Sequence, residues 1–309
     1  MTSPSPIDPL QSSGVLIVDK PQGMTSHDVI SRVRRLFGTR KVGHAGTLDP
    51  MATGVLVLGL ERGTKFLAHV VAETKTYEAT IRLGSATHSD DAEGDAVFVA
   101  PEGAVDALDD AALVAAVGKF RGDIMQRPSS VSAIKIDGKR AHQRVREGEE
   151  VSIPPRRVTV FSFDVAGIRR LVADGAPVVD VDVRVHCSSG TYIRALARDL
   201  GELLGVGGHL VALRRTEVGP FSLAQARTLE QLEHSPSLSL SLDEALTVCY
   251  PVVEVSAKEA LDLSMGKWLE PRGLKGVHAA VAPNGAAVAL VKEQGKRLAT
   301  VFVARPNTL

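Results

Sequence analysis

Hydrophobic residues in this chain fall into short runs with two different periods. The run GVLIVDK, from Gly14 to Lys20, is continuous and apolar, which is typical of a buried strand. In SHDVISRVRRLF, from Ser26 to Phe37, apolar residues recur every three or four positions, which predicts a helix with Ser26 as its N-cap. The apolar face of this helix consists of Val29, Ile30, Val33 and Leu36.

Further strands are predicted where apolar residues alternate with polar ones, or where valine and leucine alternate. They begin after Gly54 in VLVLGL, fill KTYEATIRLG from Lys75 to Gly84, and return in VVDVDVRVHC from Val178. A Ser-Ser-Gly turn then leads into a helix that ends near Gly205, and another helix is predicted from Asp109 to Phe120. The buried side of the helix before Gly205 is predicted to hold Ile193, Leu196, Leu200 and either Leu203 or Leu204.

The pattern changes after a low-complexity joint, HSPSLSLSLDEA, which we interpret as a domain boundary. Short strand-like pieces follow from about Thr247, and Asn284-Gly285 is a hairpin-turn signal. The Ser- and Pro-rich residues 1–13 are predicted to be disordered. We therefore expect a large domain over residues 14–245 and a small, mostly β domain over residues 246–309.

One acidic segment, HSDDAEGDAV from His88 to Val97, is predicted to be a solvated loop. Its carboxylates could also suggest a calcium loop. The ligand spacing of an EF-hand and its closing glutamate are missing, however, so metal binding is not favoured. The carboxylates in question are Asp90, Asp91, Glu93 and Asp95.

The composition narrows the class of protein. The 309 residues carry 36 basic and 36 acidic side chains, so the net charge does not indicate a nucleic-acid partner. A basic patch on one part of the surface is still compatible with this balance. The two cysteines, Cys187 and Cys249, lie far apart and outside any ligand motif, which indicates neither a disulfide framework nor a zinc site. The chain shows no signal-peptide pattern and no apolar run that could span a bilayer, so a cytoplasmic location without membrane contact is expected.

A single carboxylate stands in an unusual setting, within VGHAGTLDPMATGVLVLGL from Val42 to Leu60. Asp49 lies between a glycine-rich turn and an apolar strand, with Pro50 directly behind it. Because the glycines allow tight turns and the proline fixes its own φ angle, the carboxylate would be held in a fixed position where a strand of the sheet begins. The same pattern also suits a turn-forming aspartate without a chemical role, and this stretch alone leaves both interpretations open.

Two stretches are locally basic although the chain as a whole is neutral. Basic runs usually mark solvated faces, but segregated charge is also what an RNA-docking face requires. The first stretch contains Arg32, Arg34, Arg35, Arg40 and Lys41, and the second contains Arg127, Lys135, Lys139, Arg140, Arg144 and Arg146.

Three blocks in this order resemble the TruB family of tRNA pseudouridine synthases. They are GVLIVDKPQGMTSHDVISRVRR, KVGHAGTLDPMATGVLVLGLERGTKF and SSGTYIRALARDLGELLGVGGHLVALRRTEVGPF, and each is long and rich in unusual residues. The resemblance implies conversion of uridine 55 in the T-loop of tRNA to pseudouridine. It also implies an α+β fold with a mixed, mainly antiparallel sheet flanked by helices, and a C-terminal domain that looks like the RNA-binding PUA type.

The resemblance assigns expected roles to individual residues. Asp49 would be the nucleophile, Tyr77 would lie against the target base, and Arg194 would form an ion pair with Asp49. Residues expected to bind substrate are His44, Lys20, Pro21, Lys65, Tyr192 and Leu213. Residues expected near the RNA backbone are Arg35, Arg40, Lys41, Lys135, Lys139 and Arg140. The chain departs from the family pattern at Val131 and His142, where relatives often carry aromatic residues, which weakens the transfer of contacts to that segment.

The chemistry is consistent with these residue types. Forming pseudouridine breaks the bond between ribose C1′ and uracil N1 and rejoins the base through C5, so nothing is oxidised and no cofactor or metal is expected. A carboxylate suits the task because its esters are labile. Burial would raise the pKa of such an acid, whereas a neighbouring guanidinium favours its charged form. Guide-RNA-dependent relatives would be expected to carry extended basic tails, which this sequence does not show, so a monomer that acts on tRNA without a guide RNA is expected.

Two other functions remain open from the residues alone. A nucleosidase or glycosidase-like hydrolase also attacks an anomeric carbon with a carboxylate, but it usually needs a second carboxyl, for which Asp199 is a weak candidate. A non-catalytic tRNA chaperone would need the basic stretches and would use Asp49 only as a turn residue. Replacing Asp49 by asparagine separates the enzyme from the chaperone.

Overall fold

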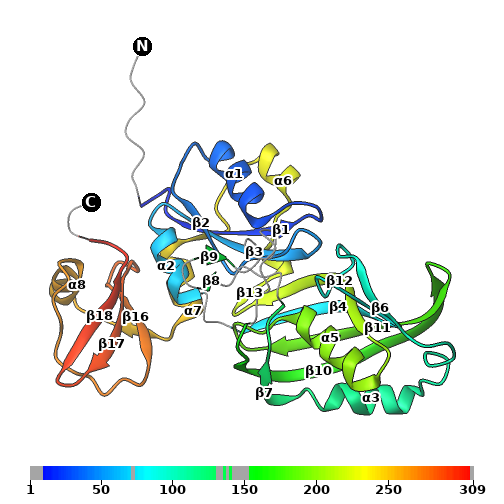
Figure 1. Cartoon of the computed structure of the whole chain (residues 1–309). Helices are drawn as coiled ribbons and strands as arrows, with labels where there is room; N and C mark the ends of the chain where they lie inside the picture. Colours follow the sequence, from blue (N-terminus) through cyan, green and yellow to red (C-terminus); the bar gives the residue numbers. More distant parts are fainter. Residues whose placement is uncertain (1–9, 71–73, 130–134, 137–138, 141–152, 307–309) are drawn as a thin grey trace. The chain divides into compact units, whose positions relative to one another are not determined.

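The computed structural model describes residues 10–70, 74–129, 135–136, 139–140 and 153–306 (Figure 1). The chain forms two compact units. Unit 1 combines Met1–Glu73 with Glu217–Leu309, and unit 2 is Thr74–Thr216. Most of the predicted disordered tail lies outside the described residues, and the domain boundary expected at residue 246 stays a prediction.

Unit 1 is built around apolar strands whose faces are buried on both sides. Strand β1 (Gly14–Lys20) pairs antiparallel with β3 (Thr53–Leu60), with Lys20 opposite Gly54. The remaining strands of this part are β2 (Val42–Ala45), which pairs with β3, β13 (Phe221–Ser222), and β14 (Leu240–Ser241), which pairs with β1. The two strands predicted from continuous apolar runs are therefore confirmed.

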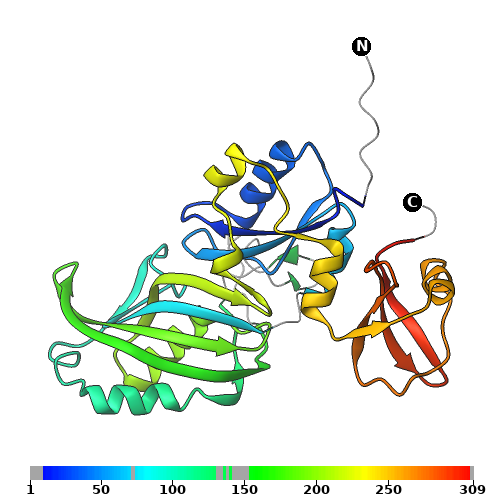
Figure 2. The ribbon, with the colours of Figure 1, turned by 180° about the vertical axis from the view of Figure 1, so that it is seen from behind.

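Most helices of unit 1 pack on these strands, whereas the last one, α8, packs on strands nearer the C-terminus. In both views α1 and α6 lie side by side (Figures 1 and 2), and an ion pair between Arg32 and Glu233 joins them. The helices are α1 (Ser26–Leu36), α2 (Gly63–Val70), the 3₁₀ turn η1 (Leu223–Gln225), α6 (Leu229–His234), α7 (Leu242–Cys249) and α8 (Ala257–Ser264). The low-complexity segment thus begins at the last residue of α6 and carries β14 and the start of α7.

A four-stranded sheet follows near the C-terminus, as the strand-like pieces predicted. Its order is β15-β16-β17-β18, and the hairpin at Asn284-Gly285 is confirmed by the Gly285 N–H, which donates to Ala282 O at 2.9 Å. The strands are β15 (Val252–Glu254), β16 (Val277–Val281), β17 (Ala287–Gln294) and β18 (Arg297–Val303). The Phe302 ring lies 6.1 Å from that of Phe66, so this sheet shares a hydrophobic cluster with α2.

Unit 2 is a twisted sheet with helices packed on it. Its strand order is β12-β4-β11-β10-β7, and the pairings β4–β11, β10–β11 and β7–β10 are antiparallel. The long hairpin of β10 and β11 is visible in both views (Figures 1 and 2). The strands of this sheet are β4 (Lys75–Leu83), β7 (Gly122–Gln126), β10 (Arg156–Ala173), β11 (Ala176–Cys187) and β12 (Gly208–Val218).

Among the residues that the structure describes, two helices and two small hairpins complete unit 2. Helices α3 (Asp110–Gly118) and α5 (Ile193–Leu204) pack against each other, and both were predicted from the sequence. The hairpins are β5 (Ser85–Thr87) with β6 (Ala96–Val99), and β8 (Lys135–Ile136) with β9 (Lys139–Arg140). With these elements, the expected α+β fold with a mainly antiparallel sheet, flanking helices and a small C-terminal sheet is confirmed.

The buried face of α5 differs slightly from the prediction. Ile193, Leu196 and Leu200 are buried, but Leu203 is exposed and Leu204 is only half-buried. The helix ends at Gly205, which has a φ of 72° and forms a left-handed C-cap. No helix in the ranges that the structure describes is long and apolar enough to cross a membrane.

Candidate functional site

Asp49 lies in the loop between β2 and β3 and is half-buried. Its carbonyl accepts a hydrogen bond from the Ala52 N–H at 3.1 Å, which closes a tight turn. Gly46 and Gly54, on either side, have φ values of 88° and 100°, which residues with a side chain rarely adopt. The expected rigid turn around Asp49 is therefore present.

Lys20 holds this turn from inside the protein. Its side chain is fully buried at the end of β1, and its Nζ donates to Pro21 O at 2.9 Å, Met24 O at 2.6 Å and Pro50 O at 3.3 Å. The Gly23 N–H also donates to Pro50 O, at 2.9 Å. A buried ammonium needs such acceptors, and here they tie the loop after β1 to the residue that follows Asp49.

Ser26 has a different role from the one predicted. The N-cap of α1 is Thr25, whose side chain accepts from the Asp28 N–H in a capping box, so the prediction of Ser26 as N-cap is wrong. Ser26 is buried instead. Its hydroxyl donates to Leu48 O at 3.1 Å and accepts from the Leu48 N–H at 2.9 Å. The start of α1 therefore fixes the residue directly before Asp49.

In unit 2, the sheet positions Tyr77 and Leu213. Tyr77 lies opposite Val185 in the pairing of β4 with β11 and is 7% exposed. Leu213, on β12, is also buried. Both positions are thus set by strands rather than by loops.

The N-terminus of α5 presents Tyr192 and Arg194. The amide side chain of Gln126 accepts from the Tyr192 N–H at 2.8 Å and donates to Tyr192 O at 3.0 Å, which fixes the first turn of the helix. Arg194 is 5% exposed, so it is not the surface arginine that its position in a helix's first turn would ordinarily suggest. Its Nη1 donates to Ser89 O at 2.9 Å and to Asp91 Oδ2 at 3.2 Å.

The acidic segment between β5 and β6 is only in part the solvated loop that was predicted, because Glu93 and Asp95 are exposed whereas two other carboxylates are buried. Asp90 and Asp91 are 8% and 3% exposed. Asp91 accepts from Arg194, from the Ser89 hydroxyl at 2.5 Å and from the Glu93 N–H at 3.1 Å. Arginines and backbone donors replace the water that these buried carboxylates would otherwise need.

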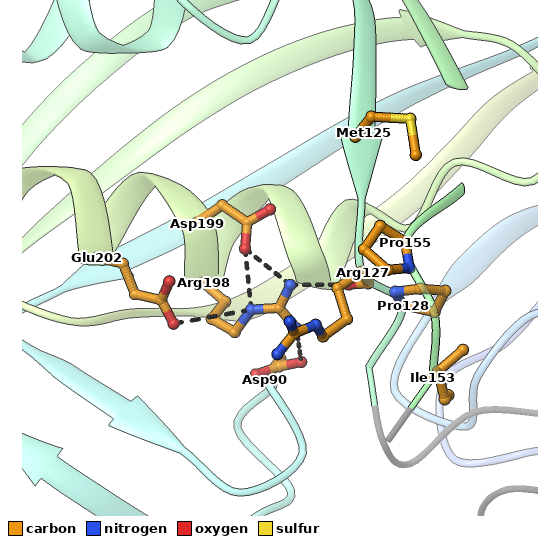
Figure 3. Close-up of a pocket in the computed structure, with 9 residues that line it drawn as sticks. All are labelled: Asp90, Met125, Arg127, Pro128, Ile153, Pro155, Arg198, Asp199 and Glu202. Carbon is orange, nitrogen blue, oxygen red and sulfur yellow. Dashed lines mark hydrogen bonds and ion pairs between the residues drawn. The ribbon is translucent and has the colours of Figure 1, made fainter. Parts of the chain in front are cut away.

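Arg198 is a half-buried arginine, one helical turn after Arg194, and lines a cavity of about 580 Å³ (Figure 3). It contacts Asp90 Oδ2 at 3.1 Å and Asp199 Oδ1 at 2.7 Å, and lies 3.9 Å from Glu202. Burial raises the pKa of Asp90, and the charge of Arg198 opposes part of that rise. Burial lowers the pKa of Arg198, but Asp199 and Asp90 together outweigh it and raise the pKa.

The other predicted site residues differ in burial. His44 on β2 and Pro21 are half-buried, and Lys65 on α2 is exposed. Arg35, Arg40 and Lys41 are exposed, as residues in contact with an RNA backbone would be, and Lys41 pairs with Glu61 at 3.2 Å.

The second basic stretch is only partly described. Lys135 faces Arg140, and Ile136 faces Lys139, in the pairing of β8 with β9. Val131, His142, Arg144 and Arg146 lie outside the described residues.

The expected site residues fall into two groups. Unit 1 brings together Asp49, Lys20 and Pro21, and unit 2 carries Tyr77, Leu213, Tyr192 and Arg194. The ion pair expected between Asp49 and Arg194 would join the two groups and stays a prediction. Sequence reasoning missed the partners of the second group, namely Ser89, Asp90, Asp91 and Arg198.

Comparison with known proteins gives matches along nearly the whole chain. The model of the TruB family pseudouridylate synthase N-terminal domain matches residues 34–193. Models of the tRNA pseudouridylate synthase B C-terminal domain and of the tRNA pseudouridine synthase II C-terminal region match residues 194–247 and 250–305. Two of the relatives are named tRNA pseudouridine synthase B. The one from Corynebacterium diphtheriae is 68% identical over 98% of this chain and 99% of its own length, and the one from Rhodococcus jostii is 57% identical over 98% of each.

Solved structures share the fold. A chain in the crystal structure of a Cbf5-Nop10-Gar1 complex has a TM-score of 0.69 and 25% identity, over 100% of this chain and 92% of that one. A chain of the archaeal box H/ACA sRNP Nop10-Cbf5 complex has a TM-score of 0.66 and 25% identity, over 96% of this chain and 87% of that one.

The fold and these matches define an enzyme of the pseudouridine synthase class, an isomerase. The chain belongs to the TruB family of pseudouridylate synthases.

Proposed function

We propose that this enzyme converts uridine 55 in the T-loop of tRNA to pseudouridine, with Asp49 as the nucleophile and without a cofactor. The observation that carries the proposal is the match to relatives named tRNA pseudouridine synthase B over 98% of the chain. The fixed turn around Asp49 supports it, because a nucleophile must be held near its target. A uridine inside a folded loop is stacked, so the enzyme extrudes it before the reaction.

Asp49 attacks the uridine at C1′ or at C6, and the carboxylate forms an ester or a base adduct that later breaks again. The C1′–N1 bond breaks, the uracil turns, and a new bond forms between C1′ and C5. The proton on C5 is then lost, and N1 gains a proton. Atoms and electrons balance without an external oxidant, reductant or group donor.

Tyr77 and Arg194 support this step. The mostly buried Tyr77 offers a flat face for the base and a hydroxyl for the C5 proton. Arg194 would place a fixed positive charge beside the Asp49 carboxylate. His44, Tyr192, Lys65 and Leu213 line the substrate site, whereas the buried Lys20 and the neighbouring Pro21 shape the turn beside Asp49.

Tritium release tests the proposal. The enzyme is expected to release tritium from C5-labelled uridine in a tRNA transcript, because C5 exchanges its proton for the bond to C1′. A transcript that carries cytidine at position 55 is the control and should release none. Equal release from both transcripts would exclude position 55, and no release from the first would exclude the activity on tRNA.

We further propose that the enzyme acts as a cytoplasmic monomer and finds the T-arm of tRNA without a guide RNA. Exposed cations of the first basic stretch, such as Arg35 and Arg40, would contact the RNA backbone. The β8–β9 hairpin contributes Lys135, Lys139 and Arg140, which gives three cations within six residues.

Reversing two of these charges is expected to weaken tRNA binding. In the variant Lys139→Glu with Arg140→Glu, the affinity should fall and the slope of log K against log salt should decrease by about 1.5, since each lost phosphate contact removes about 0.7–0.9. Single-turnover chemistry at saturating tRNA should persist. Arg157→Glu with Arg169→Glu is the control, because these exposed arginines already have acidic partners. An unchanged affinity in the first double variant would remove the hairpin from the docking face.

A further inference from the structure

Two consecutive aspartates form ion pairs with two arginines that lie one helical turn apart on α5. Asp90 and Asp91 follow each other in the loop after β5, whereas Arg194 and Arg198 lie on the same side of α5 at positions i and i+4. Asp91 pairs with Arg194 at 3.2 Å, and Asp90 pairs with Arg198 at 3.1 Å. The loop is thus attached to the helix at two successive points.

The backbone of Asp90 takes an unusual conformation to make this contact. Its φ is 62°, in the left-handed region that few residues other than glycine and asparagine adopt. The Leu210 N–H donates to Asp90 O at 3.0 Å, and the Asp90 N–H donates to Thr87 O at 3.3 Å. This conformation directs the neighbouring carbonyl of Ser89 and carboxylate of Asp91 to the same atom, Nη1 of Arg194.

Arg198 connects three segments of unit 2 (Figure 3). Its Nε and Nη2 donate to Asp199 Oδ1 at 2.9 and 2.7 Å, its Nη2 donates to Arg127 O at 2.8 Å, and its Nη1 reaches Asp90. Asp199 already provides Arg198 with a counter-charge. The Arg198 charge is the largest influence that opposes the burial-induced rise in the pKa of Asp90, ahead of a hydrogen bond with Ser129 and the charge of Arg194. Since Arg198 has Asp199 as a second counter-charge, balancing its charge does not require Asp90, which favours a positioning role for the pair.

We propose that the Asp90–Arg198 ion pair positions Arg194: it fixes the Ser89–Asp91 segment on α5 and thereby sets the direction of the Arg194 guanidinium. The inference rests on the proposed function, in which Arg194 acts on Asp49. Asp90 and Arg198 are positioning residues, since they act through Ser89 and Asp91.

The variant Asp90→Asn tests this role, because asparagine tolerates the left-handed backbone and keeps the shape while removing the charge. The single-turnover rate at saturating tRNA should fall about three- to thirtyfold, the range that such networks give, with an unchanged affinity for tRNA. The Leu210 amide should exchange its hydrogen faster, because its acceptor is the Asp90 carbonyl. The double variant Asp123→Asn with Arg157→Gln removes an exposed Asp–Arg pair of the same unit and should change neither readout.

Chemical rescue provides a second test of the positioning role. Arg198→Ala should lose at least as much rate as Asp90→Asn, and guanidinium, below concentrations that unfold the protein, should restore part of it through the cavity beside Arg198. The same ion should restore nothing when Asp90→Asn is added. If Arg198→Ala does not fold, Arg198→Lys replaces it, with a smaller rate loss expected.

The outcomes separate the two proposals. A wild-type enzyme that releases no tritium from tRNA refutes the proposed function, whereas the Leu210 exchange still reports on the ion pair. An active wild type with an Asp90→Asn variant of equal rate refutes the positioning role alone. A loss of rate explained by weaker tRNA binding or by partial unfolding at the assay temperature refutes it as well, and so does unchanged Leu210 exchange.

Discussion

Replacing Asp49 by asparagine should reduce the release of tritium from C5-labelled tRNA below detection while folding and tRNA affinity stay nearly intact. An amide has the shape of the carboxylate, but it cannot form the labile ester or adduct that the reaction requires. The turn should survive, because Lys20, Ser26 and Ala52 bond backbone atoms within Leu48–Pro50.

Three measurements check this prediction together: tritium release, equilibrium binding of tRNA and thermal unfolding. Asp106→Asn, at an exposed position of unit 2, is the matched control and should behave as wild type. A tRNA chaperone would lose nothing in Asp49→Asn, so wild-type binding combined with lost release separates the enzyme from that alternative. Appreciable tritium release by the Asp49→Asn protein would refute the role of Asp49 as the nucleophile.

Local pattern was enough to predict several strands and helices, although β10, α2 and α8 were not among them. The apolar run of β1 and the helical period of α1 depend on neighbouring residues only, and both elements begin at the predicted residue. The Asn284-Gly285 hairpin is equally local, because Gly285 tolerates its φ of 84°. Each of these features is encoded within a few residues, so no long-range contact was needed to find it.

The cap of α1 shows where local pattern stops. Thr25 and Ser26 are both good N-cap residues, and the sequence alone gives little reason to prefer one. The choice follows from two contacts: Asp28 completes a capping box with Thr25, and Ser26 bonds both backbone groups of Leu48, which is 22 residues away. The second contact is tertiary and lies outside any short window of sequence.

The acidic loop shows the same limit more strongly. Asp90 and Asp91 look like solvated residues because their arginine partners are 108 and 103 positions away along the chain. One signal was available: two adjacent acids could have been matched to arginines four residues apart on a predicted helix. The family resemblance supplied Arg194 but not these partners, and only the fold brings them together.

Arg194 is therefore held by more than its expected contact with Asp49. It is buried on α5, and its Nη1 bonds Ser89 and Asp91 at the same time. A guanidinium can serve these acceptors and still present other N–H groups, because its five donors lie in one plane. An ammonium has three donors around a single atom and cannot span the same set of acceptors.

The variant Arg194→Lys should lower the single-turnover rate by about 10² to 10³, the loss that follows removal of one aligned polar donor at a reacting group. Burial also makes a lysine here prone to lose its proton, and then Asp49 would lose its positive partner. Tritium release at saturating tRNA measures the rate, with Arg170→Lys, an exposed arginine paired with Asp110, as the control of unchanged activity. Combining Arg194→Lys with Asp49→Asn should cause no loss beyond that of Asp49→Asn, since both residues act on one step. A near-wild-type rate in Arg194→Lys would show that Arg194 does not act on Asp49 in the reaction, and its contacts with Ser89 and Asp91 would then serve only the fold.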